Sequence, residues 1–190
     1  MIPPTHFLVS WIVADATMKT RRDRAIVALA GVIQDVDGFG YQIENWITIN
    51  WDKPLLWYVD YHHILCHNVG FAAFVAVAAA CLSKGNWKTT LLACVTFHLH
   101  LLCDVVGSRG IDNYQWPIPY LLPFSNSWQL TWSGQWELSA WPNRAIGVGC
   151  FALSLWLARL KGHSPIEIVS AKADAAFVGI LRRWFPRATS

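Results

Sequence analysis

Apolar stretches of helical length make up most of the chain, and they predict a fold built from helices. They cover residues 6–18, 25–34, 64–82, 89–106 and 145–160. The third and fourth stretches are each long enough to cross a hydrocarbon core of about 30 Å. We therefore expect an all-α fold, an antiparallel bundle of four to five helices that is embedded in a membrane or associated with one.

Polar segments set the limits of these predicted helices. Thr5 can cap the first helix, and residues 35–54 and 108–143 are predicted loops, the second of them rich in Trp and Pro. Residues 164–167, Ser-Pro-Ile-Glu, have the form of a capping box that opens a last, amphipathic helix. The chain is thus predicted to be a single domain over 1–190, with a bundle over 1–162 and an amphipathic tail helix over 163–190.

The composition supports a membrane location. Hydrophobic residues make up 54% of the 190 residues and charged residues only 14%, against about 25% charged in an ordinary soluble domain. The twelve Trp residues suit a membrane interface, where the ring is buried and the N–H is hydrated. A net charge of +3 without a basic stripe gives no reason to expect a nucleic-acid partner. The five Cys residues lie in apolar segments without a C-x-x-C pattern, which favours reduced core residues.

Basic residues are concentrated in three segments, 19–24, 83–88 and 159–161. The positive-inside rule places these segments on the cytoplasmic side of a multi-pass inner-membrane protein. The opposite ends of the same helices would then face the periplasm or outer side.

Those opposite ends carry most of the ionisable groups that lie within apolar sequence. They form three clusters, at residues 35–37, 62–67 and 98–104. Ionisable groups in such surroundings are costly unless a metal, a partner charge or a proton path stabilises them. Imidazole and carboxylate without a thiolate motif are the ligand set of zinc, manganese or iron sites.

Spacing within the clusters suggests how ligands could converge. His100 and Asp104 lie one helical turn apart and could share a metal, although a structural His–Asp hydrogen bond would give the same pattern. His98 lies on another face and is either a further ligand or a core histidine. His63 and His67 share a helical face, whereas His62 could meet His67 only if the helix begins after His62.

The acidic cluster at residues 35–37 and the histidine at position 6 are weaker indications of a metal site. Asp35 and Asp37 follow an apolar helix, where the helix dipole disfavours acids unless a metal reverses the penalty. The alternative is a solvated turn before Gly38. His6 follows the predicted cap residue Thr5.

In order and spacing these residues resemble the inner-membrane, metal-dependent hydrolases of the YdjM type. The resemblance covers roughly residues 5–125. Its motifs here are His6, Gln34-Asp35-Val36-Asp37, His62 to Asn68, His100-x-x-x-Asp104, Gly107, Gly110, Trp116-Pro117 and Leu122 to Ser125. The chain departs from the family pattern at five positions. Gln34 replaces Pro, His63 replaces Arg, Ile64 replaces Gly, Cys66 replaces Thr and Asn68 replaces Ser.

The resemblance implies a metal-ligand set, and it favours His62 over His63 as the partner of His67. That set is His6, His62, His67, His100 and Asp104, with His63 and His98 as further possibilities. The family is in turn similar to the zinc-dependent phospholipase C and single-strand nuclease superfamily, all-α enzymes that act on phosphoesters. This second, more distant likeness implies one or more Zn²⁺ ions, with Mn²⁺ or Fe²⁺ as alternatives.

We therefore expect an enzyme, a metal-dependent hydrolase of a small-molecule or lipid phosphoester at the bilayer. Asp37, or else Asp35, would orient or deprotonate the attacking water, and Arg109 could offset charge on the phosphoryl oxygens. One alternative is a membrane protein that binds or moves metal ions or protons, and another is a regulatory relic of a hydrolase site. Residues 72–82 and 91–97 contain almost no polar groups, which favours catalysis over transport.

Overall fold

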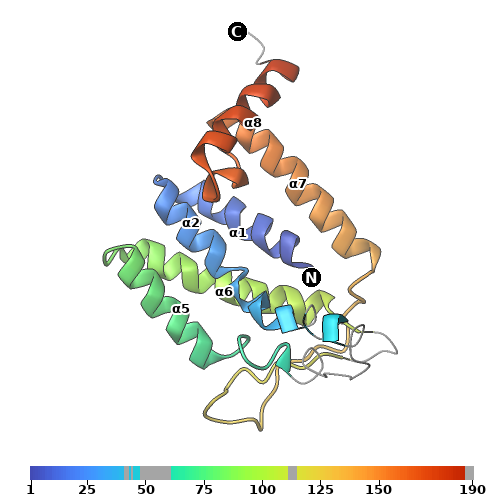
Figure 1. The fold of residues 1–190 in the computed structure, drawn as a ribbon. Coiled ribbons are helices and arrows are strands. Elements are labelled where there is room, and N and C mark those ends of the chain that lie inside the picture. The colour runs from blue at the N-terminus through green and yellow to red at the C-terminus, as the bar shows by residue number, and fades with distance from the viewer. Residues whose placement is uncertain (41–42, 44, 48–60, 111–114, 187–190) are drawn as a thin grey trace.

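A computed structural model describes residues 1–40, 43, 45–47, 61–110 and 115–186 of the chain. The fold is all-α, as the sequence predicted, and Figure 1 shows the order of its elements. They are α1 (Pro3–Thr17), α2 (Arg21–Ala30), the 3-10 helix η1 (Ile33–Phe39), α5 (Val69–Leu82), α6 (Trp87–Gly107), α7 (Trp141–Lys161), the 3-10 helix η3 (Pro165–Ile168) and α8 (Ala171–Trp184).

Helices α1, α2, α5, α6 and α7 run up and down between two ends of the molecule (Figure 1). α2 packs against α1, α5 and α6, while α7 packs along α1 and carries η3 and α8 at its far end. Apolar side chains fill the space between α2, α5 and α6. This core consists of Ala30, Val75, Ala79, Ala93, Phe97, Leu101 and Ile118.

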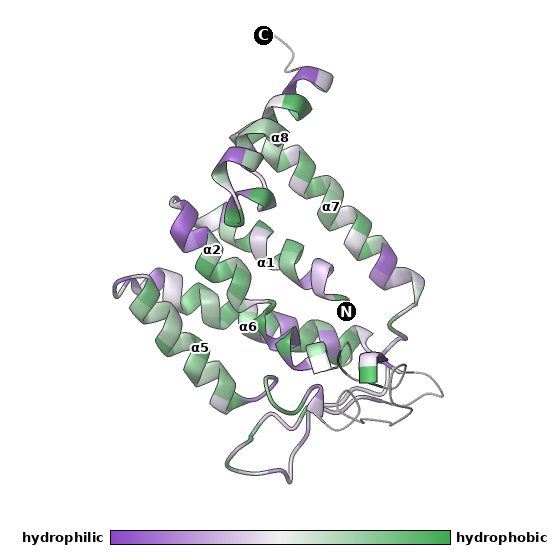
Figure 2. Ribbon diagram, in the orientation of Figure 1, coloured by the Kyte–Doolittle hydropathy of each residue, from purple (hydrophilic) through white to green (hydrophobic). Residues whose placement is uncertain are grey.

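Among the described residues, one helix, α6, is long and apolar enough to cross a membrane. At 1.5 Å per residue its 21 residues span about 31 Å. Asn86 precedes the helix, and its side-chain oxygen accepts a hydrogen bond from the Lys88 amide at 3.2 Å. Figure 2 shows apolar residues along much of α5 and α6.

The predicted span over residues 64–82 was wrong in its length. The α-helix occupies only Val69–Leu82, because Asn68 caps it and accepts a hydrogen bond from the Phe71 amide at 2.9 Å. Its 14 residues extend about 21 Å, which is less than the roughly 30 Å of a hydrocarbon core. The preceding residues, 61–68, form turns and bends instead.

Helix starts also differ from the expected ones. α1 begins at Pro3 after Ile2, so Thr5 is a buried residue inside the helix and does not cap it. α2 begins at Arg21. The side chain of the preceding residue, Thr20, caps it and accepts a hydrogen bond from the Asp23 amide at 3.1 Å. The predicted loop over 35–54 begins with the 3-10 helix η1, and its stretch 48–54 lies outside the described residues.

The capping box at Ser164 opens the short η3 helix, and α8 has a cap of its own at Ser170. Ser164 Oγ accepts from the Ile166 amide at 3.2 Å. The Glu167 side chain, which was expected to complete the box, forms two 2.6 Å bonds with the Arg24 guanidinium instead. α8 is amphipathic, as the sequence predicted.

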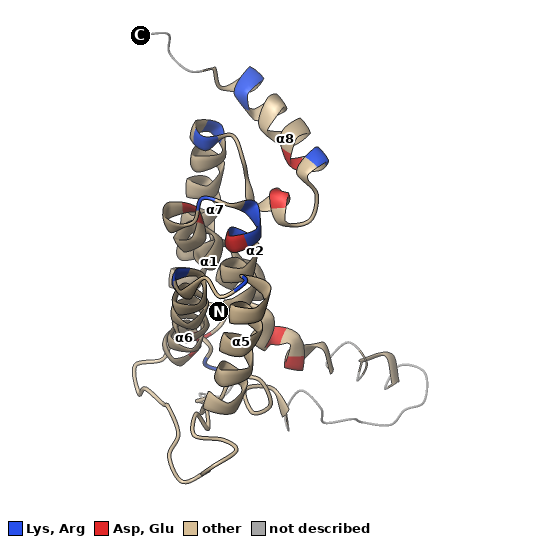
Figure 3. Ribbon diagram, turned by 90° about the vertical axis from the view of Figure 1, so that its left-hand side faces the viewer, with Lys and Arg blue, Asp and Glu red and all other residues tan. Residues whose placement is uncertain are grey.

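Basic segments far apart in the sequence meet at one end of the molecule. Arg22 Nη2 donates to the Ser83 carbonyl at 3.4 Å, and Lys161 Nζ donates to the Asp15 carbonyl at 2.9 Å. Figure 3 shows Lys and Arg around the ends of α2, α7 and α8. The clusters that the sequence singled out as ligands lie at the opposite end of the same helices.

Candidate metal centre

Four segments deliver imidazole and carboxylate groups to one buried site. His6 comes from the first turns of α1, Asp35 and Asp37 from η1, and His100 and Asp104 from the end of α6. The turn 61–68 supplies the remaining histidines, His62, His63 and His67, all buried. They meet because α1 starts, and α2 and α6 end, on the same side of an antiparallel bundle.

Asp104 occupies the centre of the site. Its Oδ1 lies 3.1 Å from His6 Nε2. Its Oδ2 faces three imidazoles, at 3.0 Å from His100 Nε2, 3.6 Å from His67 Nε2 and 3.8 Å from His63 Nε2. The Met1 amino group and the Ser108 hydroxyl also donate to Oδ1. One carboxylate therefore contacts four histidines, an arrangement suited to holding cations.

The ligand-type atoms form three overlapping groups, and within each group all of them lie within 4.8 Å of one another. The groups share members, so the site has the donors for more than one cation. The three groups are His6, His100 and Asp104; Asp35, His67 and His100; and His63, His67 and Asp104.

Hydrogen bonds on the far side of two rings fix how those rings face the centre. His67 Nδ1 lies 3.1 Å from Asp37 Oδ2, and His100 Nδ1 lies 3.0 Å from the Gly31 carbonyl. An imidazole that donates through Nδ1 presents the lone pair of Nε2 on the other side. Carboxylate or carbonyl acceptors behind metal-binding histidines commonly have this role.

Several polar atoms in the site are buried without a hydrogen-bond partner among the described residues. They include Asp104 Oδ2, Asp35 Oδ2, His6 Nδ1 and His63 Nδ1. His100 Nε2 lies 3.0 Å from Asp104 Oδ2. Buried polar atoms without partners are unfavourable, and a cation would satisfy the carboxylate oxygens. The residues present thus fit a divalent metal with nitrogen and oxygen ligands.

The carboxylates also shift the pKa values of the turn's histidines. Burial alone would lower the pKa of His67, but its contacts with Asp104 and Asp37 outweigh burial and raise the pKa to about 9. Burial would raise the pKa of Asp37, yet hydrogen bonds with His62 and His67 hold it well below its usual value. Burial, together with the adjacent His67, lowers the pKa of His63 well below 6.5.

His62 and Asp37, a predicted ligand and a predicted base, lie next to each other. His62 Nδ1 lies 2.7 Å from Asp37 Oδ1, and His62 belongs to none of the three ligand groups found among the described residues. Asp37 Oδ2 contacts His67 and also accepts from the Cys66 amide at 3.1 Å. Asp37 therefore lies behind the histidines, whereas Asp35 Oδ1 lies 3.7 Å from His100 Nε2 at the centre.

Two further predicted residues make contacts outside the three ligand groups. His98 points to the outside of α6, where its Nε2 lies 2.7 Å from the Tyr120 hydroxyl and its Nδ1 lies 2.8 Å from the Cys94 carbonyl. Arg109 pairs through its backbone with the segment around Trp136, and its Nε is buried without a hydrogen-bond partner among the described residues.

Some parts of the site could not be predicted from the sequence. His100 Nδ1 contacts the Gly31 carbonyl, which is a backbone group, and the residue type at a position does not predict such a contact. Ser108, which bonds Asp104 at 2.8 Å, could have been found from its position one helical turn later. The Trp116 ring lies beside the turn's histidines, 5.2 Å from His63 and 5.4 Å from His62 between ring centroids.

Comparison with known proteins agrees with the resemblance seen in the motifs. No curated protein and no solved structure matches the chain significantly. The family described as YdjM inner membrane protein matches residues 1–181, which include every residue of the centre. The chain therefore belongs to the YdjM inner membrane protein family.

Proposed function

We propose that this protein is a metal-dependent hydrolase that cleaves a phosphoester, in a lipid or lipid-linked substrate, at the inner membrane. The observation that carries the proposal is the convergence on Asp104 of four buried imidazoles, two of which have their Nδ1 atoms anchored from behind. A histidine and carboxylate set of this kind is typical of metal sites that keep a position open for water.

The cation would be held by His6, His63, His67, His100 and Asp104, in one or more sites. Zinc suits these donors best, with manganese and iron as alternatives. When bound, such a cation acts as a Lewis acid and lowers the pKa of water toward about 7. Asp37 keeps His67 oriented and keeps its Nε2 directed at the centre.

Asp35 is the best placed general base. Its Oδ1 lies 3.7 Å from His100 Nε2, while its Oδ2 has no hydrogen-bond partner among the described residues. Asp37, the residue first favoured for this role, has both oxygens within hydrogen-bond distance of histidines. We assign proton transfer from water to Asp35 and the positioning of His67 to Asp37.

Exposed apolar side chains around this end of the molecule support a lipid substrate. Phe39, Trp46 and Phe124 are 66%, 56% and 84% exposed, and Trp128 is half exposed as well. Aromatic side chains in such numbers are characteristic of the headgroup zone of a bilayer. The centre would then lie at the membrane surface, on the periplasmic side of a multi-pass protein, with the basic end in the cytoplasm.

The proposal can be tested with detergent-purified protein. After chelation and dialysis, zinc, manganese or iron(II) is added back, and hydrolysis of bis-p-nitrophenyl phosphate and of a short-chain phospholipid is measured. We expect metal-dependent turnover that His100→Ala abolishes and His98→Ala leaves unchanged, since His98 lies on the outside of the same helix. Turnover without added metal, or equal loss in both variants, would contradict the proposal. Stoichiometric metal without turnover on either ester would favour a binding or regulatory role.

A further inference from the structure

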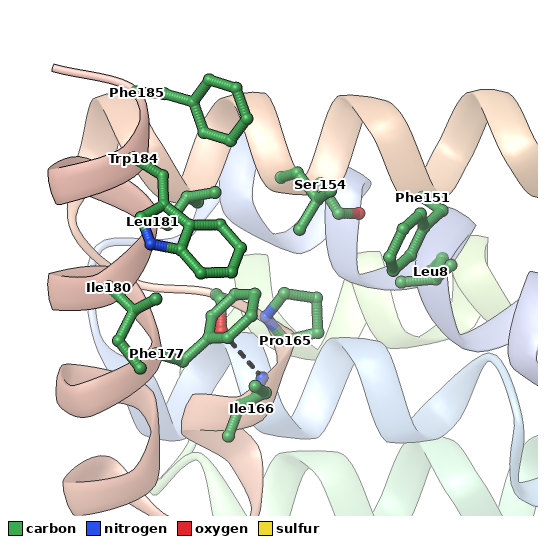
Figure 4. Close-up of a pocket in the computed structure, with 12 residues that line it drawn as sticks. Leu8, Phe151, Ser154, Pro165, Ile166, Phe177, Ile180, Leu181, Trp184 and Phe185 are labelled. Carbon is green, nitrogen blue, oxygen red and sulfur yellow. Dashed lines mark hydrogen bonds between the residues drawn. The ribbon is translucent and has the colours of Figure 1, made fainter. Parts of the chain in front are cut away.

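A cavity lies between α7 and α8. These two helices meet at the opposite end of the molecule from the metal centre (Figure 1). Its volume is about 420 Å³, which falls within the roughly 300–1,000 Å³ of small-molecule sites. Figure 4 shows apolar side chains of four elements around it. They include Leu8 of α1, Phe151 of α7, Ile166 of η3, and Phe177, Leu181 and Trp184 of α8.

The walls of this cleft present only apolar surface. Two serines contribute to the lining, but Ser164 Oγ donates to Asp174 at 2.6 Å, and Ser154 is buried. On the outer side Trp184 is 75% exposed and Phe185 is 57% exposed. The cleft is therefore open and apolar, and contact of its walls with water is unfavourable. Such a surface is suited to binding an apolar ligand.

Positive charge surrounds one end of the cleft. Arg159 Nε donates to the Phe185 carbonyl at 2.7 Å, and Arg182 Nε donates to the Arg159 carbonyl at 3.0 Å. Arg182 and its neighbour Arg183 are both exposed. Both residues directly precede Trp184 and Phe185 in the chain, so their positive charges lie next to the aromatic residues at this end of the cleft.

The acidic residues nearby do not offset this charge at the surface. Glu167 is buried in its pair with Arg24. Asp174 is buried too and accepts from the amide and the hydroxyl of Ser164. Among the residues that the structure describes, the exposed charge around the cleft is therefore cationic.

We propose that this cleft binds one acyl chain of an anionic phospholipid, whose phosphate lies on the guanidinium groups of Arg182 and Arg183. The apolar walls suit a hydrocarbon chain, and the cationic rim complements a headgroup that carries net negative charge. A zwitterionic lipid would fill the cleft equally well but would gain less from the rim. α8, amphipathic and basic, places both features at a membrane surface. This site does not depend on the hydrolase activity.

The test is native mass spectrometry of the full chain, titrated in detergent with dioleoyl phosphatidylglycerol or dioleoyl phosphatidylcholine. We expect one phosphatidylglycerol per chain, bound at least about fivefold more tightly than phosphatidylcholine. Arg183→Glu should remove this preference. The matched control is Lys172→Glu, which makes the same charge change on an exposed residue of the same helix and should keep it.

A second pair of variants tests the cleft itself. Ser154→Phe fills the cavity and should lower the bound phosphatidylglycerol at least about tenfold, while Ser154→Ala leaves the cavity open and should retain it. The proposal is overturned if the two lipids bind equally, if Arg183→Glu and Lys172→Glu behave alike, or if the chain forms dimers that exclude the lipid. If Ser154→Phe does not fold, the comparison of Arg183→Glu with Lys172→Glu still tests the proposal, because both residues are exposed and their substitution should not prevent folding.

Discussion

The Nε2 atoms of His67 and His100 lie 3.2 Å apart in the interior of the site. Each ring has its Nδ1 within hydrogen-bond distance of an acceptor, Asp37 for His67 and the Gly31 carbonyl for His100. If both Nδ1 atoms donate, two Nε2 lone pairs face each other, and that arrangement needs a proton or a cation between them. A proton on His67 satisfies this arrangement in the metal-free protein, and a metal that both rings share would replace that proton.

The first prediction concerns metal content. His67→Ala and His100→Ala should each reduce bound zinc, manganese or iron from at least one per chain to a small fraction, because each removes a ligand atom from two of the three groups. His98→Ala should retain the full content, since it contacts Tyr120 instead. Elemental analysis of purified protein measures this. Full metal content in His100→Ala would exclude the site described here.

The second prediction concerns pH. The folded protein without metal has a His67 pKa of about 9, above the unfolded value of about 6.5. Protonated His67 therefore adds stability that is fully present below pH 6.5 and is lost as the pH rises through 9. A metal must displace this proton, so zinc affinity should rise by up to about tenfold per pH unit between pH 6.5 and 8.5.

Competition with a chelator at several pH values gives the zinc affinity directly. The metal-free protein supplies a second measurement, because its free energy of unfolding should fall between pH 7 and 9.5. An affinity that does not change with pH would mean that His67 holds no proton in the metal-free site.

The third prediction separates the two acids of η1. Asp37→Asn removes the charge that orients His67, so metal affinity should fall about 10- to 100-fold. Asp35→Asn should instead lower turnover by about 10²- to 10⁴-fold, with a smaller loss of metal. Kinetics at saturating metal distinguish these outcomes. If Asp37→Asn lowers turnover while metal affinity stays unchanged, Asp37 is the base after all.

Sequence spacing predicted the site residues better than it predicted their local structure. The i, i+4 spacing of His63 and His67 suggested a shared helical face, and the structure brings both Nε2 atoms to Asp104. The segment is not an α-helix, however, and His63 has a positive φ of 67°. A capping residue, Asn68, makes the helix begin later than predicted, at Val69, and periodicity alone cannot show that.

The position of His62 shows what a motif cannot specify. The family resemblance gave His62 the role of a ligand; in the structure its Nδ1 lies 2.7 Å from Asp37 and His62 is in none of the three ligand groups among the described residues, so that role stays a prediction. Two adjacent histidines differ only in the direction in which the backbone turns them, and that direction depends on tertiary contacts. The clustering of the site at one end of the bundle was predictable, because it follows from helix order and the antiparallel topology.

The fourth prediction concerns orientation in the membrane. In a chain with its five cysteines replaced, Ser127→Cys reports on the site end and Lys88→Cys on the basic end. An impermeant maleimide should label Ser127→Cys from the periplasm and should label Lys88→Cys only after lysis, by the positive-inside rule. Labelling of Lys88→Cys alone in unlysed cells would reverse the orientation and leave the site geometry untouched.

The fifth prediction concerns the buried ion pair that ties α2 to η3. Arg24 binds both Glu167 oxygens at 2.6 Å, and its Nη1 donates to the Lys19 carbonyl at 2.9 Å. Glu167→Gln leaves the guanidinium buried without its carboxylate, so the free energy of unfolding should fall by about 3–5 kcal/mol. Glu137→Gln, at an exposed position, should change it by less than about 0.5 kcal/mol.

Chemical denaturation in detergent micelles measures the free energy of unfolding of both variants. A double variant shows whether the loss comes from an unpaired charge. Arg24→Met with Glu167→Leu removes both charges together and should recover much of the loss, because two buried charges that are replaced by apolar groups no longer need each other. If Glu167→Gln unfolds like the wild type, the pair is hydrated in solution and does not stabilise the contact between α2 and η3. If the double variant is as unstable as Glu167→Gln, the loss comes from packing around η3 and not from an unpaired charge.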